Sequence, residues 1–141
     1  MIDPELVRRK IVLIFRDLDA LRPLAEKPLA DYLASPADEP LAECYLERMI
    51  GRMIDINYHL LTESGRPPPV DYHASFLELA LLGVHQPDFA RRIALCAGLR
   101  NRIVHEYNDL DPRRVHEALP VALEDIPAYL GAVERYLERA G

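Results

Sequence analysis

One stretch of the sequence combines side chains that could together break a phosphodiester bond. It reads Arg100-Asn101-Arg102-Ile103-Val104-His105-Glu106-Tyr107. A histidine that titrates near neutral pH can move the proton of a ribose 2′-hydroxyl, and an arginine can hold the phosphate and stabilise the charge that develops on its oxygens. The stretch therefore indicates cleavage of RNA by a scheme that requires no metal ion and no cofactor.

The polar groups of this stretch are expected to converge on one edge of a helix. At about 100° per residue, Arg100 and Tyr107 share one face, whereas Asn101 and His105 stand four positions apart on the adjacent face. Asn101 could orient His105 or donate to the phosphate, and Tyr107 could donate through its hydroxyl. Structural hydrogen bonds on an ordinary helix would use the same spacing, so spacing alone leaves both interpretations open.

Arginines around the stretch form a basic island on an acidic chain. The chain has 141 residues and a formal net charge of −6, which argues against broad wrapping of nucleic acid. Between positions 91 and 114, six arginines stand against three acidic residues, a local charge of +3 that leaves −9 elsewhere. Such an island can hold a phosphate, and its RNA-binding candidates are Arg91, Arg92 and Arg102. Solvated helix faces would produce the same pattern.

Helical periodicity in the rest of the chain must position these residues. Apolar residues recur at spacings of three and four, and acidic residues followed by proline mark helix starts. The predicted helices are one from Asp3-Pro4, one over 29–33, one of about 25 residues from Asp38 as the longest, one over 73–83, one from Gln86, and one from Asp111. We therefore expect an all-α, up-and-down helical bundle of about five to six helices, forming a single domain over residues 1–141.

Prolines interrupt this periodicity at two places. Three consecutive prolines within 65–70 predict a turn and an extended loop, because they remove backbone donors and fix φ. Pro120 and Pro127 fall inside the last predicted helix, where we expect a kink or a break near one of them.

Composition favours a protein of the cytoplasm. Half of the residues are hydrophobic and 28% are charged, as in ordinary soluble domains. No apolar run approaches the roughly 18 residues that a membrane span needs, and the first residues carry acids where a secretory signal would carry basic residues. We therefore expect no membrane association.

The cysteines and the remaining histidines show no metal-binding or redox spacing. Cys44 and Cys96 form no CxxC pair, so both are expected to be core thiols. His73, His85 and His116 fall near predicted loops or helix ends, and are expected at the surface or as helix caps.

The motif and its surroundings resemble a known family. Arg100, four residues, His105, one residue and Tyr107, with Asn101 after the arginine, resemble the signature of HEPN-domain proteins, specifically the HepT-like ribonuclease toxins. The segments 43–48, 55–61, 76–83 and 98–107 occur in the order that this family shows. The resemblance therefore covers nearly the whole chain.

The resemblance implies an all-α domain that forms a homodimer, with the arginine and histidine of each subunit lining a shared cleft where RNA is cut without metal. It implies catalytic roles for Arg100 and His105, with Asn101 and Tyr107 in support. It also implies a partner, an MNT-type nucleotidyltransferase antitoxin. In some members this antitoxin transfers AMP to the motif tyrosine, here Tyr107, and the added anionic group would occupy the phosphate site beside Arg100.

Three interpretations follow as alternatives. The first is a metal-independent endoribonuclease toxin of a type II or VII toxin–antitoxin system, which cuts single-stranded or loop RNA by attack of the 2′-hydroxyl. The second is a catalytically silent HEPN dimer that serves the nucleotidyltransferase as binding partner or AMP acceptor; a purely structural helical dimer is a third. All share one fold, so the discriminating feature is whether Arg100 and His105 face an open groove or are buried in ion pairs.

Overall fold

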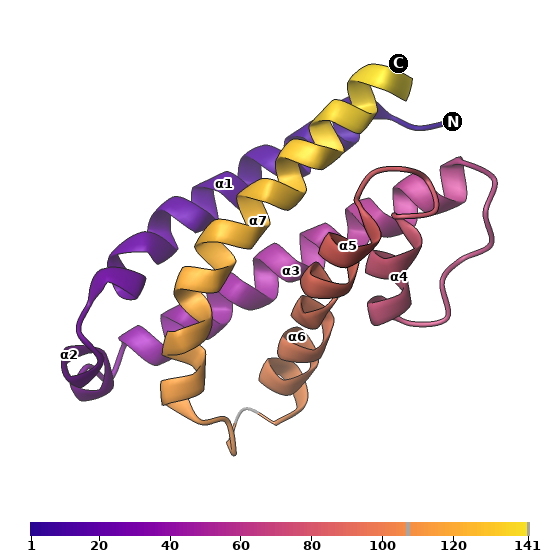
Figure 1. Ribbon diagram of the computed structural model, residues 1–141. Coiled ribbons are helices and arrows are strands. Elements are labelled where there is room, and N and C mark those ends of the chain that lie inside the picture. The colour runs from indigo at the N-terminus through magenta and orange to yellow at the C-terminus, as the bar shows by residue number, and fades with distance from the viewer. Residues whose placement is uncertain (107, 141) are drawn as a thin grey trace.

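The described part of the chain is a bundle of α-helices. The computed structural model describes residues 1–106 and 108–140, and it contains no β-strand within these ranges. Its helices, coloured along the chain in Figure 1, are α1 (Pro4–Glu26), α2 (Leu29–Ala34), α3 (Asp38–Glu63), α4 (Tyr72–Glu78), α5 (Pro87–Ile93), α6 (Leu95–His105) and α7 (Pro112–Ala140). The predicted all-α fold is confirmed.

The first helix begins where its sequence signals predict. The side chain of Asp3 accepts a hydrogen bond from the backbone N–H of Leu6 at 3.1 Å, and Pro4 occupies the first turn. Apolar residues at spacings of three and four form one buried stripe along this helix: Val7, Ile11, Ile14, Leu18 and Leu21. This stripe packs α1 against α3 and α7.

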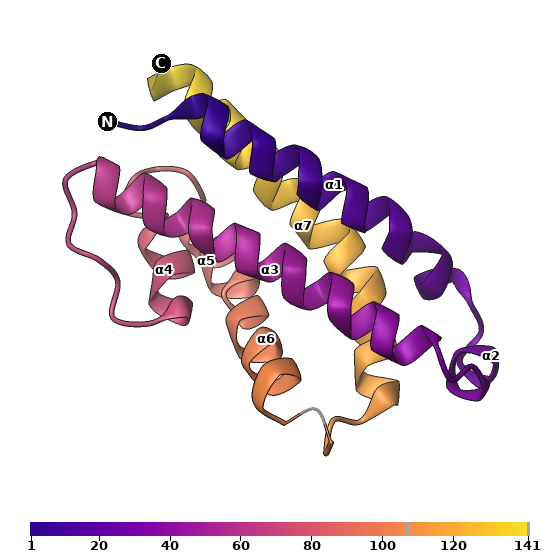
Figure 2. The ribbon, with the colours of Figure 1, turned by 180° about the vertical axis from the view of Figure 1, so that it is seen from behind.

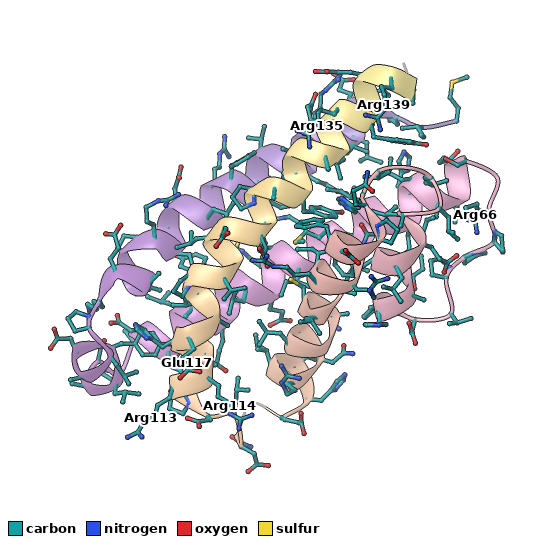
Figure 3. All side chains as sticks on the ribbon, viewed as in Figure 1. Arg66, Arg113, Arg114, Glu117, Arg135 and Arg139 are labelled. Carbon is teal, nitrogen blue, oxygen red and sulfur yellow. The ribbon has the colours of Figure 1, made fainter. Side chains whose placement is uncertain are left out.

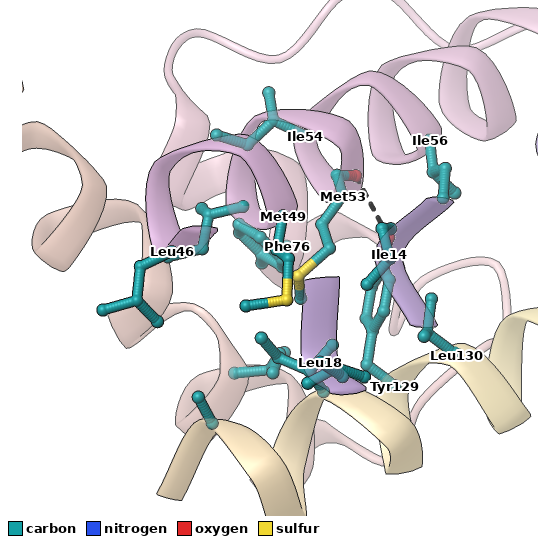
Figure 4. Packing of buried hydrophobic residues seen from close by; sticks show 14 of the residues in the cluster. Ile14, Leu18, Leu46, Met49, Met53, Ile54, Ile56, Phe76, Tyr129 and Leu130 are labelled. Atoms are coloured by element: carbon teal, nitrogen blue, oxygen red, sulfur yellow. Dashed lines mark hydrogen bonds between the residues drawn. The ribbon is translucent and has the colours of Figure 1, made fainter. Parts of the chain in front are cut away.

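The central element is α3, which packs against α1, α4, α6 and α7. Figures 1 and 2 show it running through the molecule, with α1 on one side and α4 to α6 on the other. Its buried side chains meet those of α1, α4 and α7 in one apolar cluster, of which Figure 4 labels Ile14, Leu18, Leu46, Met49, Met53, Ile54, Ile56, Phe76, Tyr129 and Leu130. α3 has 26 residues and α7 has 29, so the prediction that α3 is the longest helix is wrong.

The last helix passes both of its prolines without a break. Pro120 and Pro127 lie inside α7, and a buried stripe that includes Leu119 and Ile126 continues past them. In both ribbon views, the two ends of α7 run in different directions (Figures 1 and 2). The predicted irregularity is therefore a bend, because burial of the stripe offsets the backbone hydrogen bonds that the prolines remove.

The segment between α3 and α7 is divided more finely than predicted. α4 ends at Glu78 instead of near Gly83, which has a φ of +79° at the end of the following turns. The helix expected from Gln86 is two helices, because α5 ends at Ile93 and α6 begins at Leu95. This division gives seven helices among the described residues where about five to six were expected.

A buried hydrogen-bond network holds α4 onto α3 and α7. The hydroxyl of Tyr129 donates to the Met53 carbonyl at 3.1 Å and to Oδ1 of Asn57 at 2.5 Å. Nδ2 of Asn57 donates to Oγ of Ser75 at 3.1 Å, and Ser75 in turn donates to the carbonyl of Tyr72 at 2.6 Å. The network fixes the first turn of α4, and with it Tyr72, against the central helix.

Among the described residues, none of the helices combines the length and the apolar composition that crossing a lipid bilayer requires.

Candidate active site

The residues of the motif lie on the last two turns of α6 and on the chain that follows it. Asn101 and His105 are exposed one helical turn apart, and His105 is the last residue of the helix. Arg100 is half-buried instead. At 3.6 residues per turn, Arg100 and His105 lie about 140° apart around the helix axis. Tyr107 lies outside the described residues.

The expectation that these polar groups converge on one helical edge is therefore wrong for Arg100. The side of α6 that faces the core carries the buried residues Ala97 and Ile103, and Arg100 lies on that side. α6 packs mainly against α3 and α4, so this side faces them and cannot also carry His105. Among the described motif residues, Asn101 and His105 share a face that Arg100 does not.

Arg100 lies in an open depression between α3, α4 and α6. Its guanidinium carbon stands 5.2 Å from the ring centroid of Tyr72, a cation–π contact. Its Nε is buried and has no hydrogen-bond partner among the described residues. Within the described part of the chain, no carboxylate forms an ion pair with Arg100. The catalytic interpretation requires this, because the guanidinium must be able to bind a phosphate.

His105 is accessible from solvent at the end of α6. The helix closes with Glu106, whose backbone N–H donates to the Arg102 carbonyl at 2.8 Å. Within the described ranges, neither a hydrogen bond nor an ion pair joins the side chain of His105 to another residue. This histidine can therefore approach a ribose from solvent without breaking a contact of the fold.

The arginines of the basic island differ in how far they are neutralised. Arg92 on α5 donates through Nε to Oδ2 of Asp125 on α7 at 2.9 Å, and its Nη2 lies 2.7 Å from Oδ1. Arg91 pairs with Asp88 one turn earlier on α5. Arg102 is exposed on α6. Arg113 and Arg114 extend from the start of α7 (Figure 3), and Arg114 lines the same groove as Arg102 of α6. Of the three predicted RNA-binding arginines, Arg102 is the one that the described contacts leave free of ion pairs.

A largely apolar groove separates α6 from α7. Its volume is about 720 Å³, and its lining includes Leu95, Leu99, Arg102, Val121 and Asp125. Leu95 and Val121 are 69% and 52% exposed, which is high for large apolar side chains. The groove adjoins the face of α6 that carries His105.

The other histidines do not all lie where the sequence places them. His73 is exposed and the Nε2 atom of His116 lies 2.9 Å from the Lys27 carbonyl, so both lie at the surface or near a helix end. His85 is buried, contrary to expectation, between the rings of Phe89 and Tyr129. Burial, together with the positive charge of Arg135, lowers its pKa to about 4. The turn after α4 folds back onto the core, which a local pattern cannot reveal.

The two cysteines also differ from each other. Cys96 is partly buried against the core, where it also lines the groove between α6 and α7, and burial raises the pKa of its thiol to about 12. Cys44 is exposed on α3, so its predicted core position is wrong. Among the described residues, no three His, Cys, Asp or Glu side chains lie together as a metal ion would require.

Tyr72 lies beside the candidate site, although the sequence did not predict it there. Tyr72 contacts Arg100, although 28 positions separate them in the sequence. The only local signal is Asp71, whose side chain accepts from the Ala74 N–H at 2.7 Å and so places Tyr72 in the first turn of α4. That signal predicts a helix start, and it does not predict what the helix faces.

Comparison with known proteins gives a family and a curated relative. A family model described as Ribonuclease HepT-like matches residues 14–141. A curated relative from Aphanizomenon flos-aquae (strain 2012/KM1/D3), named tRNA nuclease HepT, is 35% identical over 136 residues. The match covers 96% of this chain and 92% of the relative.

Solved structures share the fold at lower sequence identity. The tri-AMPylated HEPN toxin of Shewanella oneidensis, in complex with an MNT antitoxin, matches with a TM-score of 0.84 and 21% identity over 96% of this chain and 99% of that chain. A toxin–antitoxin structure with AMP-PNP matches with a TM-score of 0.84 and 20% identity over 93% and 98%. YutE of Bacillus subtilis, a cytosolic protein of unknown function, matches with a TM-score of 0.85 and 13% identity over 99% and 93%.

The family match over residues 14–141 and the 35% identity along nearly the full length show that this chain belongs to the ribonuclease HepT-like family.

Proposed function

We propose that this chain is the toxin of a bacterial toxin–antitoxin pair and that it cuts RNA in the cytoplasm without a metal ion. The 2′-hydroxyl of a ribose attacks the adjacent phosphorus, His105 moves its proton, and Arg100 holds the phosphate oxygens. Asn101 and Tyr107 support them by hydrogen bonds. The observation that carries the proposal is the state of two residues on α6. His105 is exposed at the end of the helix, and Arg100, earlier on the same helix, has no ion-pair partner among the described residues.

The active form in this proposal is a homodimer. Because Arg100 and His105 lie about 140° apart around α6, one copy of the helix does not bring both to a single phosphate. A second chain packed beside α6 would supply the missing group. The groove between α6 and α7, with exposed Leu95 and Val121, offers an apolar surface for that contact.

The substrate in this proposal is single-stranded or loop RNA. In-line attack needs the 2′-oxygen, the phosphorus and the leaving oxygen on one line, and a regular duplex resists that geometry. The curated relative is named a tRNA nuclease, which makes tRNA the first substrate to test. The exposed Arg102 would contact the RNA backbone. Arg92, which lines the same groove, and Arg91, next to it on α5, are the further candidates.

An MNT-type nucleotidyltransferase is the proposed antitoxin. The Shewanella oneidensis toxin of the same fold is described as tri-AMPylated and bound to an MNT antitoxin. By the same chemistry, AMP transferred to Tyr107 would add negative charge against the incoming RNA.

Expression without an antitoxin tests the proposal. The wild type, His105→Ala and the matched control His73→Ala, which removes another exposed histidine, are expressed in bacteria, and total RNA is examined. We expect growth arrest and RNA cleavage with the wild type and the control. We expect cleavage by His105→Ala to fall at least about 100-fold, the usual contribution of a positioned acid–base group.

Two measurements on the purified proteins make the result decisive. Circular dichroism shows whether His105→Ala is folded, and mass spectrometry shows whether Tyr107 of the wild type is unmodified. If the folded, unmodified wild type cleaves no RNA, the nuclease proposal is wrong and a silent dimer that serves as AMP acceptor becomes the better account.

A further inference from the structure

The depression beside Arg100 gathers cationic and aromatic side chains from three helices. α3 supplies Arg48, Arg52 and Tyr58, α4 supplies Tyr72, and α6 supplies Arg100. Its volume is about 560 Å³, within the range of small-molecule sites. The combination of guanidinium groups with tyrosine rings is typical of surfaces that bind single-stranded nucleic acid.

The aromatic part of the depression is held rigidly. The rings of Tyr58 and Tyr72 meet edge to face, with centroids 6.3 Å apart and planes at 82°. Tyr72 is also fixed by the Ser75 hydroxyl on its carbonyl and by the guanidinium of Arg100 over its ring. Since Tyr72 remains 37% exposed, part of its ring is still available to another flat group.

The arginines of α3 that line the depression keep a net positive charge despite their ion pairs. The buried carboxylate of Asp17 on α1 pairs with both Arg48 and Arg52, and its Oδ2 lies 3.0 Å from Nη1 of Arg52. One carboxylate cannot neutralise two guanidinium groups, so one positive charge remains at this edge. Arg48 is exposed, and its guanidinium can reach a ligand while its partner stays buried.

The remaining charged side chains leave the depression weakly positive. Glu47 and Asp55 also line it, and Lys10 pairs with Asp55 at 3.4 Å. Together with Asp17, these residues place three carboxylates against one lysine and three arginines, a net charge of +1. That balance suits one phosphate group and not a long run of them.

The floor of the depression contains a glycine. A Cβ atom built on Gly51 would meet no other atom within 4 Å, so the space above this turn of α3 is open. A Cβ atom added here would enter open space at the depression without displacing any existing group.

We propose that this depression binds one nucleotide of a single-stranded RNA, next to the phosphate that Arg100 holds, with the base on Tyr72 and the neighbouring phosphate on Arg48. The inference rests on the proposed function for the identity of the ligand as RNA. It adds a binding subsite that would help to decide where along an RNA strand the cut is made.

The first test measures binding of short RNA hexanucleotides in which fluorine replaces each 2′-hydroxyl, so that cleavage is blocked. One oligonucleotide carries bases and a second has the same backbone without bases. We expect Tyr72→Ala to weaken binding of the base-containing strand about tenfold, as for loss of one stacked base, and to leave binding of the abasic strand unchanged.

Two further variants serve as matched controls for the ring. Tyr72→Phe keeps the aromatic face and should bind the base-containing strand like the wild type. Tyr136→Ala removes a half-buried tyrosine that also lies under an arginine, Arg139, but on α7 outside the depression. This variant should not change affinity.

The second test changes the depression without removing its aromatic groups. Gly51→Leu should fill the open space and weaken binding of the base-containing strand at least about tenfold, without lowering the melting temperature, because leucine is a better helix former than glycine. Arg48→Gln should reduce the slope of log affinity against log salt by about 0.7. Arg8→Gln, which removes an exposed arginine paired with Glu134, should leave that slope unchanged.

Equal losses for the two strands in Tyr72→Ala would overturn the inference, because the ring would then act only through Arg100. Failure of the wild type to bind either strand, or wild-type affinity in Gly51→Leu, would overturn it as well. These outcomes are distinct from failure of the nuclease proposal, which is read from RNA cleavage by the wild type and His105→Ala. Base-dependent binding without any cleavage would keep the subsite and reject the nuclease.

Discussion

Two histidines of this chain illustrate how burial decides what an imidazole can do. His105 is exposed at the end of α6, where solvent and a ligand can reach its ring. His85 is enclosed by Phe89 and Tyr129, with ring centroids 5.1 and 5.3 Å away, and neither of its nitrogens has a hydrogen-bond partner among the described residues. Its lowered pKa keeps it neutral near pH 7, so it takes no part in proton transfer.

The buried His85 predicts a specific dependence of stability on pH. Its pKa falls from the ordinary value of 6.5 to about 4 in the folded chain. Between these values the unfolded chain binds a proton that the folded chain does not, so the free energy of unfolding falls as the pH is lowered through this window. The loss amounts to roughly 3 kcal/mol and levels off below about pH 4, where both states are protonated.

Urea unfolding of the wild type and His85→Leu from pH 7 to pH 4 measures this contribution. As the pH falls, the free energy of unfolding of the wild type should decrease relative to that of His85→Leu, because leucine cannot bind a proton in the unfolded chain. His73→Leu, at an exposed histidine, should follow the wild type. Parallel curves for the wild type and His85→Leu would show that His85 does not titrate differently on folding.

At the scale of the elements, an ion pair joins α5 to α7. The carboxylate of Asp125 is buried and receives two hydrogen-bonding contacts from Arg92, whose own side chain is half-exposed. Removing the arginine would leave a buried carboxylate without its cation, whereas removing the carboxylate would leave an arginine that water can solvate. Arg92 therefore has a structural role that the basic island in the sequence does not reveal.

The asymmetry of this pair can be measured. We expect Arg92→Gln to lower the free energy of unfolding by about 2 kcal/mol, and the double variant Arg92→Gln/Asp125→Asn to recover most of that loss. Arg91→Gln, which removes an exposed arginine paired with the exposed Asp88, should cost less than about 0.5 kcal/mol. Urea denaturation provides the values, and equal effects of Arg91→Gln and Arg92→Gln would refute the structural role.

At the scale of the whole molecule, the groove between α6 and α7 predicts the site of dimerisation. We expect light scattering to give twice the mass of one chain for the wild type and the mass of one chain for Leu95→Glu, because a charge would then face the apolar surface of the second copy. RNA cleavage should be lost together with the dimer, since the proposed cleft is shared.

Leu81→Glu is the matched control for this variant. Leu81 is 65% exposed, close to the 69% of Leu95, but lies in the turns after α4 and does not line the groove. It should remain dimeric and active. A dimer that survives Leu95→Glu would place the interface elsewhere on the chain.

The amino-acid sequence by itself determined the helical fold and the family. Spacings of three and four between apolar residues, with Asp-Pro starts, are local properties of the chain, and they predicted α1, α2 and α3 at nearly their observed positions. The Arg100 to Tyr107 motif, read with its flanks, indicated the HepT-like ribonucleases that the comparisons confirm. The roles of the individual motif residues and the extent of a single domain stay predictions.

Only the tertiary structure decided which side of each helix meets the core. Periodicity gives the angle between Arg100 and His105, but the packing of α6 against α3 and α4 puts Arg100 inside and leaves His105 in solvent. The same packing brings Tyr72 and Arg48 beside Arg100. Other tertiary contacts bury His85 against Phe89 of α5 and Tyr129 of α7, and Cys44 lies on an exposed side of α3. Most of these contacts join residues far apart in the chain. Their free energy depends on the surface that each helix buries, and the spacing of neighbouring residues does not predict that surface.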